Sequence, residues 1–167
     1  LKGTILLNRQ PVSIKNPAHA ISLGLGVYLN NARYSHITHL KVKEYLFLWS
    51  KRLIIPNKQL AAMARALLDE YEVNISPDAF VFDLTQEEWS LVFLLMLLAR
   101  KPANLILDEP GADFSETGKQ HLFRILQKYR NSAGILYLSN QLEEILQVAD
   151  RVTILKEGAT LACFPIE

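Results

Sequence analysis

Helices and strands alternate in the second half of this sequence, and the alternation constrains the fold more strongly than any other feature. A helix is predicted over residues 85–100, stops near Pro102 and is followed by the short apolar strand NLIL at 104–107. A second helix over 116–129 leads to the apolar strand GILYL at 134–138. Strands that take turns with helices pair as a parallel sheet, so we expect an α/β fold with a mostly parallel sheet flanked by helices.

The remaining predicted elements are short, and polar loop residues separate them. Asn16 precedes Pro17 in NPAHAISLG, the pattern of a one- or two-turn helix with an N-cap residue and a proline at its first position. The other predicted elements are strands at 4–7, 11–14, 26–29 and 151–155, helices at 42–49, 59–71 and 141–148, and a C-terminal hairpin that turns at KEG.

The whole chain, 1–167, is interpreted as a single domain. Half of its residues are apolar, which is enough to bury one core. The segment 41–80 contains no convincing strand. We therefore expect a helical subdomain over approximately 41–100, inserted in an α/β core that consists of 1–40 and 101–167.

Charge and cysteine content exclude several classes of protein. Eighteen Lys and Arg residues stand against seventeen Asp and Glu residues, and no basic stripe is interleaved with aromatic residues, so no nucleic-acid partner is expected. Cys163 is the single cysteine, which excludes an internal disulfide and a cysteine-based zinc cluster, and we expect it to be a small buried residue. The apolar run WSLVFLLMLLA has about half of the roughly 20 residues that span a bilayer, so it is interpreted as a buried core helix.

Two carboxylates follow the strand NLIL directly. Asp108 and Glu109 stand at its carboxyl end, which is where ligands bind in open α/β sheets. In phosphoryl transfer, one carboxylate at such a position helps to hold a magnesium ion and the next polarises the attacking water, the arrangement called a Walker B motif. The alternative is a pair of solvated charges at the end of a strand.

The nearby Gly118 and Lys119 do not complete a phosphate-binding loop. Asp113 stands where the first glycine of G-x-x-x-x-G-K-[ST] is required, and Gln120 stands where a Ser or Thr is required. Lys119 is therefore interpreted as a lysine on a helix surface. The pattern has no other match in the sequence, so Walker-B-like carboxylates are present without a phosphate cradle.

Long stretches of the chain resemble an ATP-binding cassette (ABC) domain, a P-loop NTPase fold. FDLTQEEWSLVFLLMLLARKPANLILDEP and LYLSNQLEEILQVADRVTILKEG are similar to its C-terminal two-thirds, and GTILLNRQPVSIKNPAHAISLGLGVYL is similar to the segment after the P-loop helix in bacterial ribose and galactose importers. The resemblance covers nearly the whole chain and implies that the Walker A segment is absent from it. We expect either a piece of a longer cassette protein or, alternatively, a naturally truncated and degenerate half.

The resemblance implies roles for four residues around the carboxylates. Asp108 falls on the Walker B aspartate and Glu109 on the adjacent catalytic glutamate. The signature loop, which covers the ATP of the partner cassette, falls on LTQEEW, where Thr85 keeps a hydroxyl and Glu87 replaces the key glycine. A carboxylate at that glycine position repels the γ-phosphate, so this half-site is expected to be poor or inactive.

Three further positions follow from the same resemblance. The switch histidine falls on Asn140, which donates a hydrogen bond but carries no charge. The Q-loop glutamine falls on Asn30, so Asn30 and Asn140 are the expected γ-phosphate sensors. The D-loop aspartate falls on Ser115 if the loop aligns without a gap, and Asp113 takes its role if the loop shifts.

The ligands and partners that the resemblance implies are those of an importer. They are ATP and Mg²⁺, with Asp108 as the magnesium residue and a P-loop from a further segment, together with membrane-spanning permease subunits and a second ABC domain in the same chain or a homodimer. The expected function is ATP binding for import of a sugar or similar small solute at the cytoplasmic face of the inner membrane, with little or no hydrolysis. A non-enzymatic interaction or scaffold domain is the alternative, and an ABC protein of DNA repair or translation is a third, which the importer-like front segment disfavours.

The histidines give no comparable signal. His36 and His39 are three residues apart in YSHITHLK, but no acidic residue or cysteine lies near them, so no metal site is expected there. His19 and His121 fall in predicted helices and are interpreted as surface or packing residues.

Overall fold

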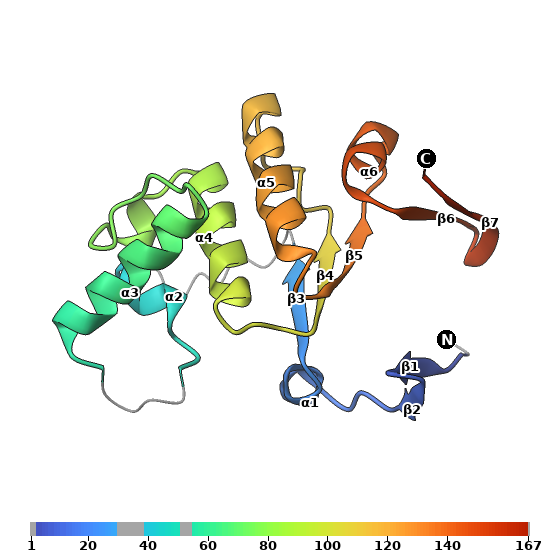
Figure 1. The fold of residues 1–167 in the computed structure, drawn as a ribbon, viewed down its shortest axis with the longest axis horizontal. Coiled ribbons are helices and arrows are strands. Elements are labelled where there is room, and N and C mark those ends of the chain that lie inside the picture. Colours follow the sequence, from blue (N-terminus) through green and yellow to red (C-terminus); the bar gives the residue numbers. More distant parts are fainter. Residues whose placement is uncertain (1–2, 30–38, 51–54, 167) are drawn as a thin grey trace.

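A three-stranded parallel sheet lies at the centre of the computed structural model, which describes residues 3–29, 39–50 and 55–166. Its strands, in spatial order, are β3 (Leu25–Leu29), β4 (Asn104–Asp108) and β5 (Gly134–Leu138) (Figure 1). Leu25 pairs with Asn104, and Asn104 pairs with Gly134, so the three strands begin level with one another. The expected α/β fold, a mostly parallel sheet flanked by helices, is confirmed.

Helices α4 (Gln86–Leu98) and α5 (Glu116–Tyr129) cover one face of this sheet. Tyr28 of β3 packs against Phe93 of α4, with ring centroids 5.1 Å apart. Leu105 and Leu107 of β4 lie on the same side as Tyr28 and are fully buried, because alternate residues of a strand face the same way. The core of the molecule therefore lies between this face and the two helices.

Helix α4 is apolar around its whole circumference, and its residues 90–98 are all buried. It packs against β3 on one side and against the short helix α2 (Val42–Leu46) on another, and α2 in turn packs on α3 (Asn57–Glu70). A helix enclosed in this way needs no polar face. The prediction of a buried core helix is confirmed, and no helix of the described ranges combines the length and the apolar character that crossing a membrane requires.

The start of α2 is held by the segment that precedes a short 3-10 helix, η1 (Val81–Asp83). Lys41 and Phe80 form an isolated antiparallel bridge. Lys43 is buried, and its Nζ donates to Asp78 Oδ1 at 2.6 Å. This hydrogen bond lowers the pKa of the exposed Asp78 carboxyl below its usual value.

Two antiparallel hairpins lie outside the central sheet. They consist of β1 (Ile5–Leu7) with β2 (Gln10–Val12), and of β6 (Arg151–Lys156) with β7 (Ala159–Pro165). The connecting helices are α1 (Pro17–Ser22), which leads into β3, and α6 (Leu142–Val148), which leads from β5 to β6. Asn16 caps α1 as predicted, because its side chain accepts a hydrogen bond from His19 N at 2.8 Å.

Two local expectations are wrong. Cys163 is exposed on β7 because nearly all of this strand is exposed. Hydrogen bonds from the Thr153 hydroxyl and from Arg151 lower the pKa of its thiol. The helix expected over 42–49 ends at Leu46, and two of the apolar residues beyond it, Leu48 and Trp49, are exposed.

Candidate functional site

The carboxyl ends of β4 and β5 bring together two of the predicted site residues. Asn140 N, just after β5, donates to Glu109 Oε1, just after β4, at 3.1 Å. Glu109 N also donates to Leu138 O at 3.0 Å. Glu109 has a φ of 48°, a left-handed conformation that is uncommon for a residue other than glycine. Five other described non-glycine residues share this conformation, Lys101 and Glu157 among them, so it does not by itself mark a functional site.

Asp108 is the last residue of β4 and its side chain is exposed. Within the described ranges, no group of three or more His, Cys, Asp or Glu side chains is arranged to hold a metal ion. Mg²⁺ in nucleotide sites is usually held by one or two carboxylates together with substrate phosphates and water. Asp108 therefore fits a single magnesium ligand in a nucleotide complex, and the described residues do not form a metal cage of their own.

Thr85 has a structural role at the start of α4. Its hydroxyl accepts a hydrogen bond from Glu88 N at 3.3 Å, and Glu88 Oε2 accepts one from Thr85 N at 2.8 Å. This reciprocal pair is a capping box, which satisfies two backbone donors of the first helical turn. The pattern T-x-x-E in the sequence carries the signal for this role, and the resemblance to a signature loop does not.

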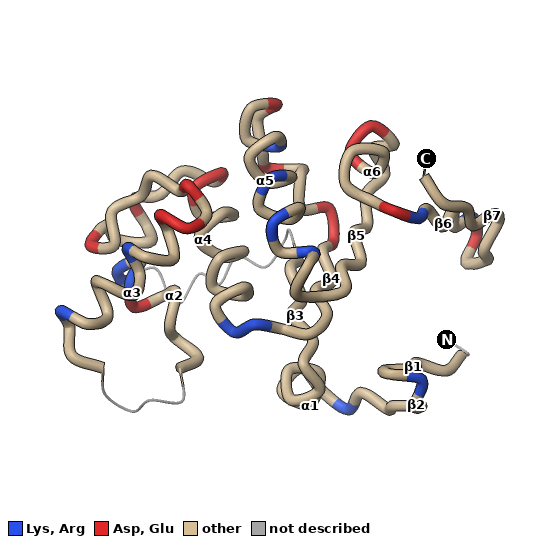
Figure 2. The backbone as a smooth tube through the Cα atoms, viewed as in Figure 1, with Lys and Arg blue, Asp and Glu red and all other residues tan. Residues whose placement is uncertain are grey.

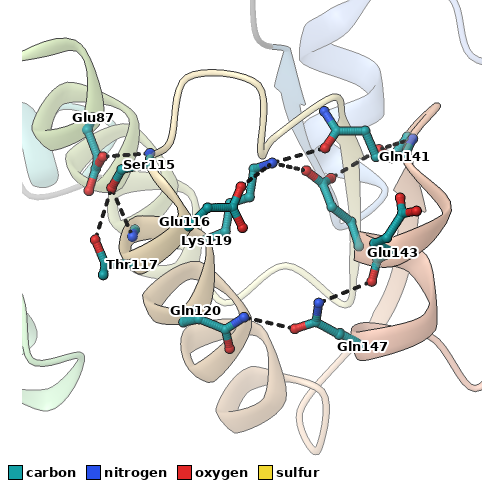
Figure 3. Close-up of polar contacts among 12 residues, drawn as sticks. Glu87, Ser115, Glu116, Thr117, Lys119, Gln120, Gln141, Glu143 and Gln147 are labelled. Atoms are coloured by element: carbon teal, nitrogen blue, oxygen red, sulfur yellow. Dashed lines mark hydrogen bonds and ion pairs between the residues drawn. The ribbon is translucent and has the colours of Figure 1, made fainter.

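Glu87 is bound to the start of α5 (Figure 3). Its Oε2 accepts a hydrogen bond from Ser115 N at 3.0 Å. Ser115 is the N-cap residue of α5, and its hydroxyl accepts from Gly118 N at 3.1 Å. A side chain at Gly118 would collide with the Glu87 carboxylate. The N-terminal end of a helix dipole favours a negative charge, so Glu87 stabilises α5 as well as linking it to α4.

Two residues on different elements therefore lie in direct contact: Glu87, which the resemblance assigns to the signature loop, and Ser115, which it assigns to the D-loop if no gap is present. The alternative D-loop residue, Asp113, also contacts α4, because its Oδ2 accepts a hydrogen bond from Gln86 Nε2 at 3.0 Å. Two hydrogen bonds therefore join the residues before α5 to the first turn of α4.

The interpretation of Lys119 as a surface lysine is wrong. Its side chain is only 13% exposed, and its Nζ lies 3.1 Å from Glu144 Oε1 of α6. Nζ also donates to Gln141 Oε1 at 2.9 Å (Figure 3). The contact with the Glu144 carboxylate raises the pKa of Lys119 above its usual value. The sequence gives no sign of this contact, because a single chain shows a charged helix residue but not the group that faces it.

The other candidates lie apart from this cluster. Asn30 and His36 are outside the described residues, and His39 is exposed at the beginning of the next described range. His19 and His121 lie in α1 and α5 as predicted. His121 Nε2 is 2.8 Å from Tyr71 O, so it joins α5 to the end of α3.

Charges of both signs are interspersed along the described chain (Figure 2). Glu87 and Glu88 stand in the first turn of α4, and Arg100 and Lys101 follow its last turn. This order complements the helix dipole, with negative charge at the N-terminal end and positive charge at the C-terminal end. The helix dipole therefore explains why these four charged residues lie at the two ends of α4.

An apolar cavity of about 490 Å³ lies between α1, β3, α2 and α4. Val27, Tyr45, Trp49 and Phe93 contribute to its wall. It contains none of the predicted site residues that the structure describes, so its size alone does not mark a nucleotide site. The chemistry-bearing groups are at the carboxyl ends of β4 and β5 and around the start of α5.

Comparison with curated proteins finds relatives over nearly the full chain. The chain is 30% identical over 169 residues to a ribose import ATP-binding protein of Rubrobacter xylanophilus, covering 99% of this chain and 34% of that protein. It is 29% identical over 164 residues to a galactose/methyl galactoside import ATP-binding protein of Clostridium perfringens, covering 96% of this chain and 32% of that protein. The chain thus spans about a third of the length of the curated relatives it matches. No protein-family model matches it.

Solved structures give the same fold. A nucleotide-free ATP-binding cassette from an ABC transporter superposes with a TM-score of 0.79 at 16% identity, covering 99% of this chain and 70% of that chain. A Clostridium perfringens component of an ABC transporter complex superposes with a TM-score of 0.78 at 17% identity, covering 97% of this chain and 65% of that chain. At these identities the likeness concerns the fold.

Proposed function

We propose that this chain, which has the fold of an ATP-binding cassette and homologues among ribose and galactose import ATP-binding proteins, is part of the ATP-binding component of an importer for a sugar or a similar small solute. In this proposal it acts at the cytoplasmic face of the inner membrane. Its partners are membrane-spanning permease subunits and a second cassette domain.

The observation that carries the proposal is the pair of carboxylates after β4. Asp108 is exposed where an oxygen ligand of Mg²⁺ is needed. The Glu109 carboxylate accepts a hydrogen bond from the backbone N–H of Asn140, at the edge of the sheet where ligands bind. In the proposal Glu109 orients water and Asn140 senses the γ-phosphate, while ATP and Mg²⁺ supply the phosphoryl group and its charge compensation.

Little or no hydrolysis by this chain is part of the proposal. Glu87 brings a carboxylate to the position of the signature glycine, and Asn140 brings a neutral amide to the position of the switch histidine. A negative charge repels phosphate, and an amide cannot become cationic. The hydrogen bond from Ser115 N to Glu87 also supports the alternative function, a scaffold domain, because it uses the signature position for internal packing.

Calorimetric titration with Mg²⁺ and ATP tests the proposal. The chain has no phosphate-loop pattern of its own, so the titrated protein must also contain the further segment that supplies the P-loop. We then expect binding that Asp108→Asn weakens at least tenfold and that Asp69→Asn, a matched change on the exposed surface of α3, leaves unchanged. No binding to any of the three proteins would favour the scaffold alternative. Binding that ignores Asp108→Asn would contradict the assigned magnesium role.

Phosphate release measured on the same proteins tests the second part. We expect wild type and Glu109→Gln to release phosphate at the same, background rate. A wild-type rate that falls on Glu109→Gln substitution would show that the chain is a competent ATPase in spite of Glu87 and Asn140.

A further inference from the structure

A buried carboxylate lies behind the proposed site. Glu144 of α6 is 4% exposed. Its Oε2 accepts hydrogen bonds from Tyr137 Oη at 2.8 Å and from Ser139 Oγ at 3.0 Å. Its Oε1 has no aligned hydrogen-bond donor, but the Lys119 ammonium lies 3.1 Å away. Burying a charge is costly unless it is paired, so Lys119 is the group that makes an ionised Glu144 tolerable here.

Two members of this cluster, Lys119 and Tyr137, have raised pKa values. Contact with Glu144 raises the pKa of Lys119, and burial together with Glu144 raises the pKa of Tyr137. Lys119 therefore remains a cation, and the Tyr137 hydroxyl remains a donor.

The same carboxylate also touches the loop that follows β4. A Cβ added to Gly111 would lie 2.6 Å from Glu144 Oε1 and 2.9 Å from its other oxygen. Gly111 comes two residues after Glu109. One side chain therefore packs against both loops that carry the proposed site, the loop after β4 and the loop after β5.

Hydrogen bonds join the buried cluster to the two residues that flank Asn140, Ser139 and Gln141. Ser139 Oγ accepts from Gln141 N at 3.1 Å, and the Gln141 side chain accepts from Lys119 Nζ at 2.9 Å (Figure 3). Asn140 lies between these two fixed residues. Its backbone N–H donates to Glu109 Oε1 at 3.1 Å.

We propose that Lys119 and Glu144 are positioning residues, which fix the loop after β5 so that the backbone N–H of Asn140 donates a hydrogen bond to the Glu109 carboxylate. The assignment of Glu109 to a nucleotide site rests on the proposed function. The positioning itself is a property of the free chain, so it is testable without nucleotide.

The test is hydrogen exchange of the backbone amides of the full chain at a single pH. In wild type, the hydrogen bond to Glu109 should slow the exchange of the Asn140 N–H, and Glu109→Ala should abolish that protection. In Glu144→Gln and in Lys119→Gln, Asn140 should lose most of its protection. Glu143→Gln, one residue away on the exposed side of α6, should keep all of it.

Gly111→Ala approaches the same carboxylate from the other loop and adds a second test. The new methyl group displaces Glu144 without removing any charge, so Asn140 should again lose most of its protection from exchange. Lys119→Arg keeps the positive charge and should restore at least part of it. These variants keep the proposal open to refutation even if Glu144→Gln fails to fold.

The outcomes separate this proposal from the proposed function. Unchanged protection of the Asn140 amide in folded Glu144→Gln, Lys119→Gln and Gly111→Ala would overturn the positioning role, whether or not Mg²⁺ and ATP bind. Loss of this protection in the variants, with no nucleotide binding in the calorimetric test, would support positioning and overturn the proposed function alone.

Discussion

The two faces of the central sheet are similar in composition but different in burial. On the face under α4 and α5, Tyr28, Leu105 and Leu107 are at most 1% exposed. On the opposite face, Leu29 is 46% exposed and Leu136 is 57% exposed. The same three strands therefore carry a packed core on one side and an apolar surface on the other, within the described residues.

The burial of a strand face depends on the elements that cover it as well as on the apolar residues of the strand. Parallel strands are usually buried on both faces and are apolar at successive positions, as NLIL and GILYL are. Val27, Ile106 and Leu136 form one cross-strand row on the open face. The strands thus specify two covered faces, and helices α4 and α5 cover one of them.

The largest expected effect is on the covered face. Leu107→Ala should lower the free energy of unfolding by about 2–5 kcal/mol, because it removes buried methyl groups and leaves a cavity. Urea denaturation followed by circular dichroism measures the change. A loss below about 1 kcal/mol would show that the face under α4 and α5 is less tightly packed than its burial indicates.

The next effect is a loss of stability at high pH. Burial raises the pKa of Tyr28 from 10.0 to about 12. The neutral phenol is favoured in the folded state, so its contribution is complete below pH 10 and is lost as pH rises toward 12. The loss is on the order of 2 kcal/mol.

Denaturation at a series of pH values checks this, with Tyr28→Phe as the comparison. The variant should lose less stability than wild type between pH 10 and pH 12, because Phe does not titrate. Tyr71, whose pKa is also raised to about 12, should leave part of the alkaline loss in both proteins. Identical pH profiles would contradict the assigned burial of Tyr28.

A smaller effect on stability is expected at the N-cap residue of α4, one of the two helices that cover the buried face. Thr85→Ala removes the capping box of α4 and should cost about 1 kcal/mol. Thr85→Ser keeps the hydroxyl and should cost less than half as much. Equal losses in the two variants would mean that the methyl group of Thr85, and not its hydroxyl, stabilises the start of α4.

The smallest effect should come from the open face. Leu136→Ala makes the same chemical change as Leu107→Ala on the neighbouring strand, yet it should change stability by less than about 0.5 kcal/mol. A loss above about 2 kcal/mol would show that this face is covered in solution and would erase the contrast between the two faces.

Much of the fold was predictable from local patterns. The helix over 116–129 has the predicted limits, because Ser115 is an N-cap residue and the apolar positions recur at helical spacing. The helix over 42–49 was predicted too long, since its apolar residues continue past Leu46. A single sequence shows an apolar side chain but not whether another element will cover it.

The candidate site divides in the same way. The proximity of Glu109 and Asn140 follows from a general rule, because the carboxyl ends of neighbouring parallel strands meet at one edge. The pairs Glu87 with Ser115 and Lys119 with Glu144 join helices that are distant in the sequence. Only the three-dimensional arrangement of α4, α5 and α6 shows that these charged residues have partners.

The pairing of Leu25 with Asn104 has a consequence for the order of folding. During synthesis β3 emerges early, but its neighbour β4 emerges only after α2, α3 and α4. Pairing between distant segments is slow, whereas helices form from local contacts within microseconds. We therefore expect α2, α3 and α4 to become ordered first on the ribosome. Strand β3 remains unpaired until β4 emerges, and we expect this stretch of the nascent chain to depend most on a chaperone.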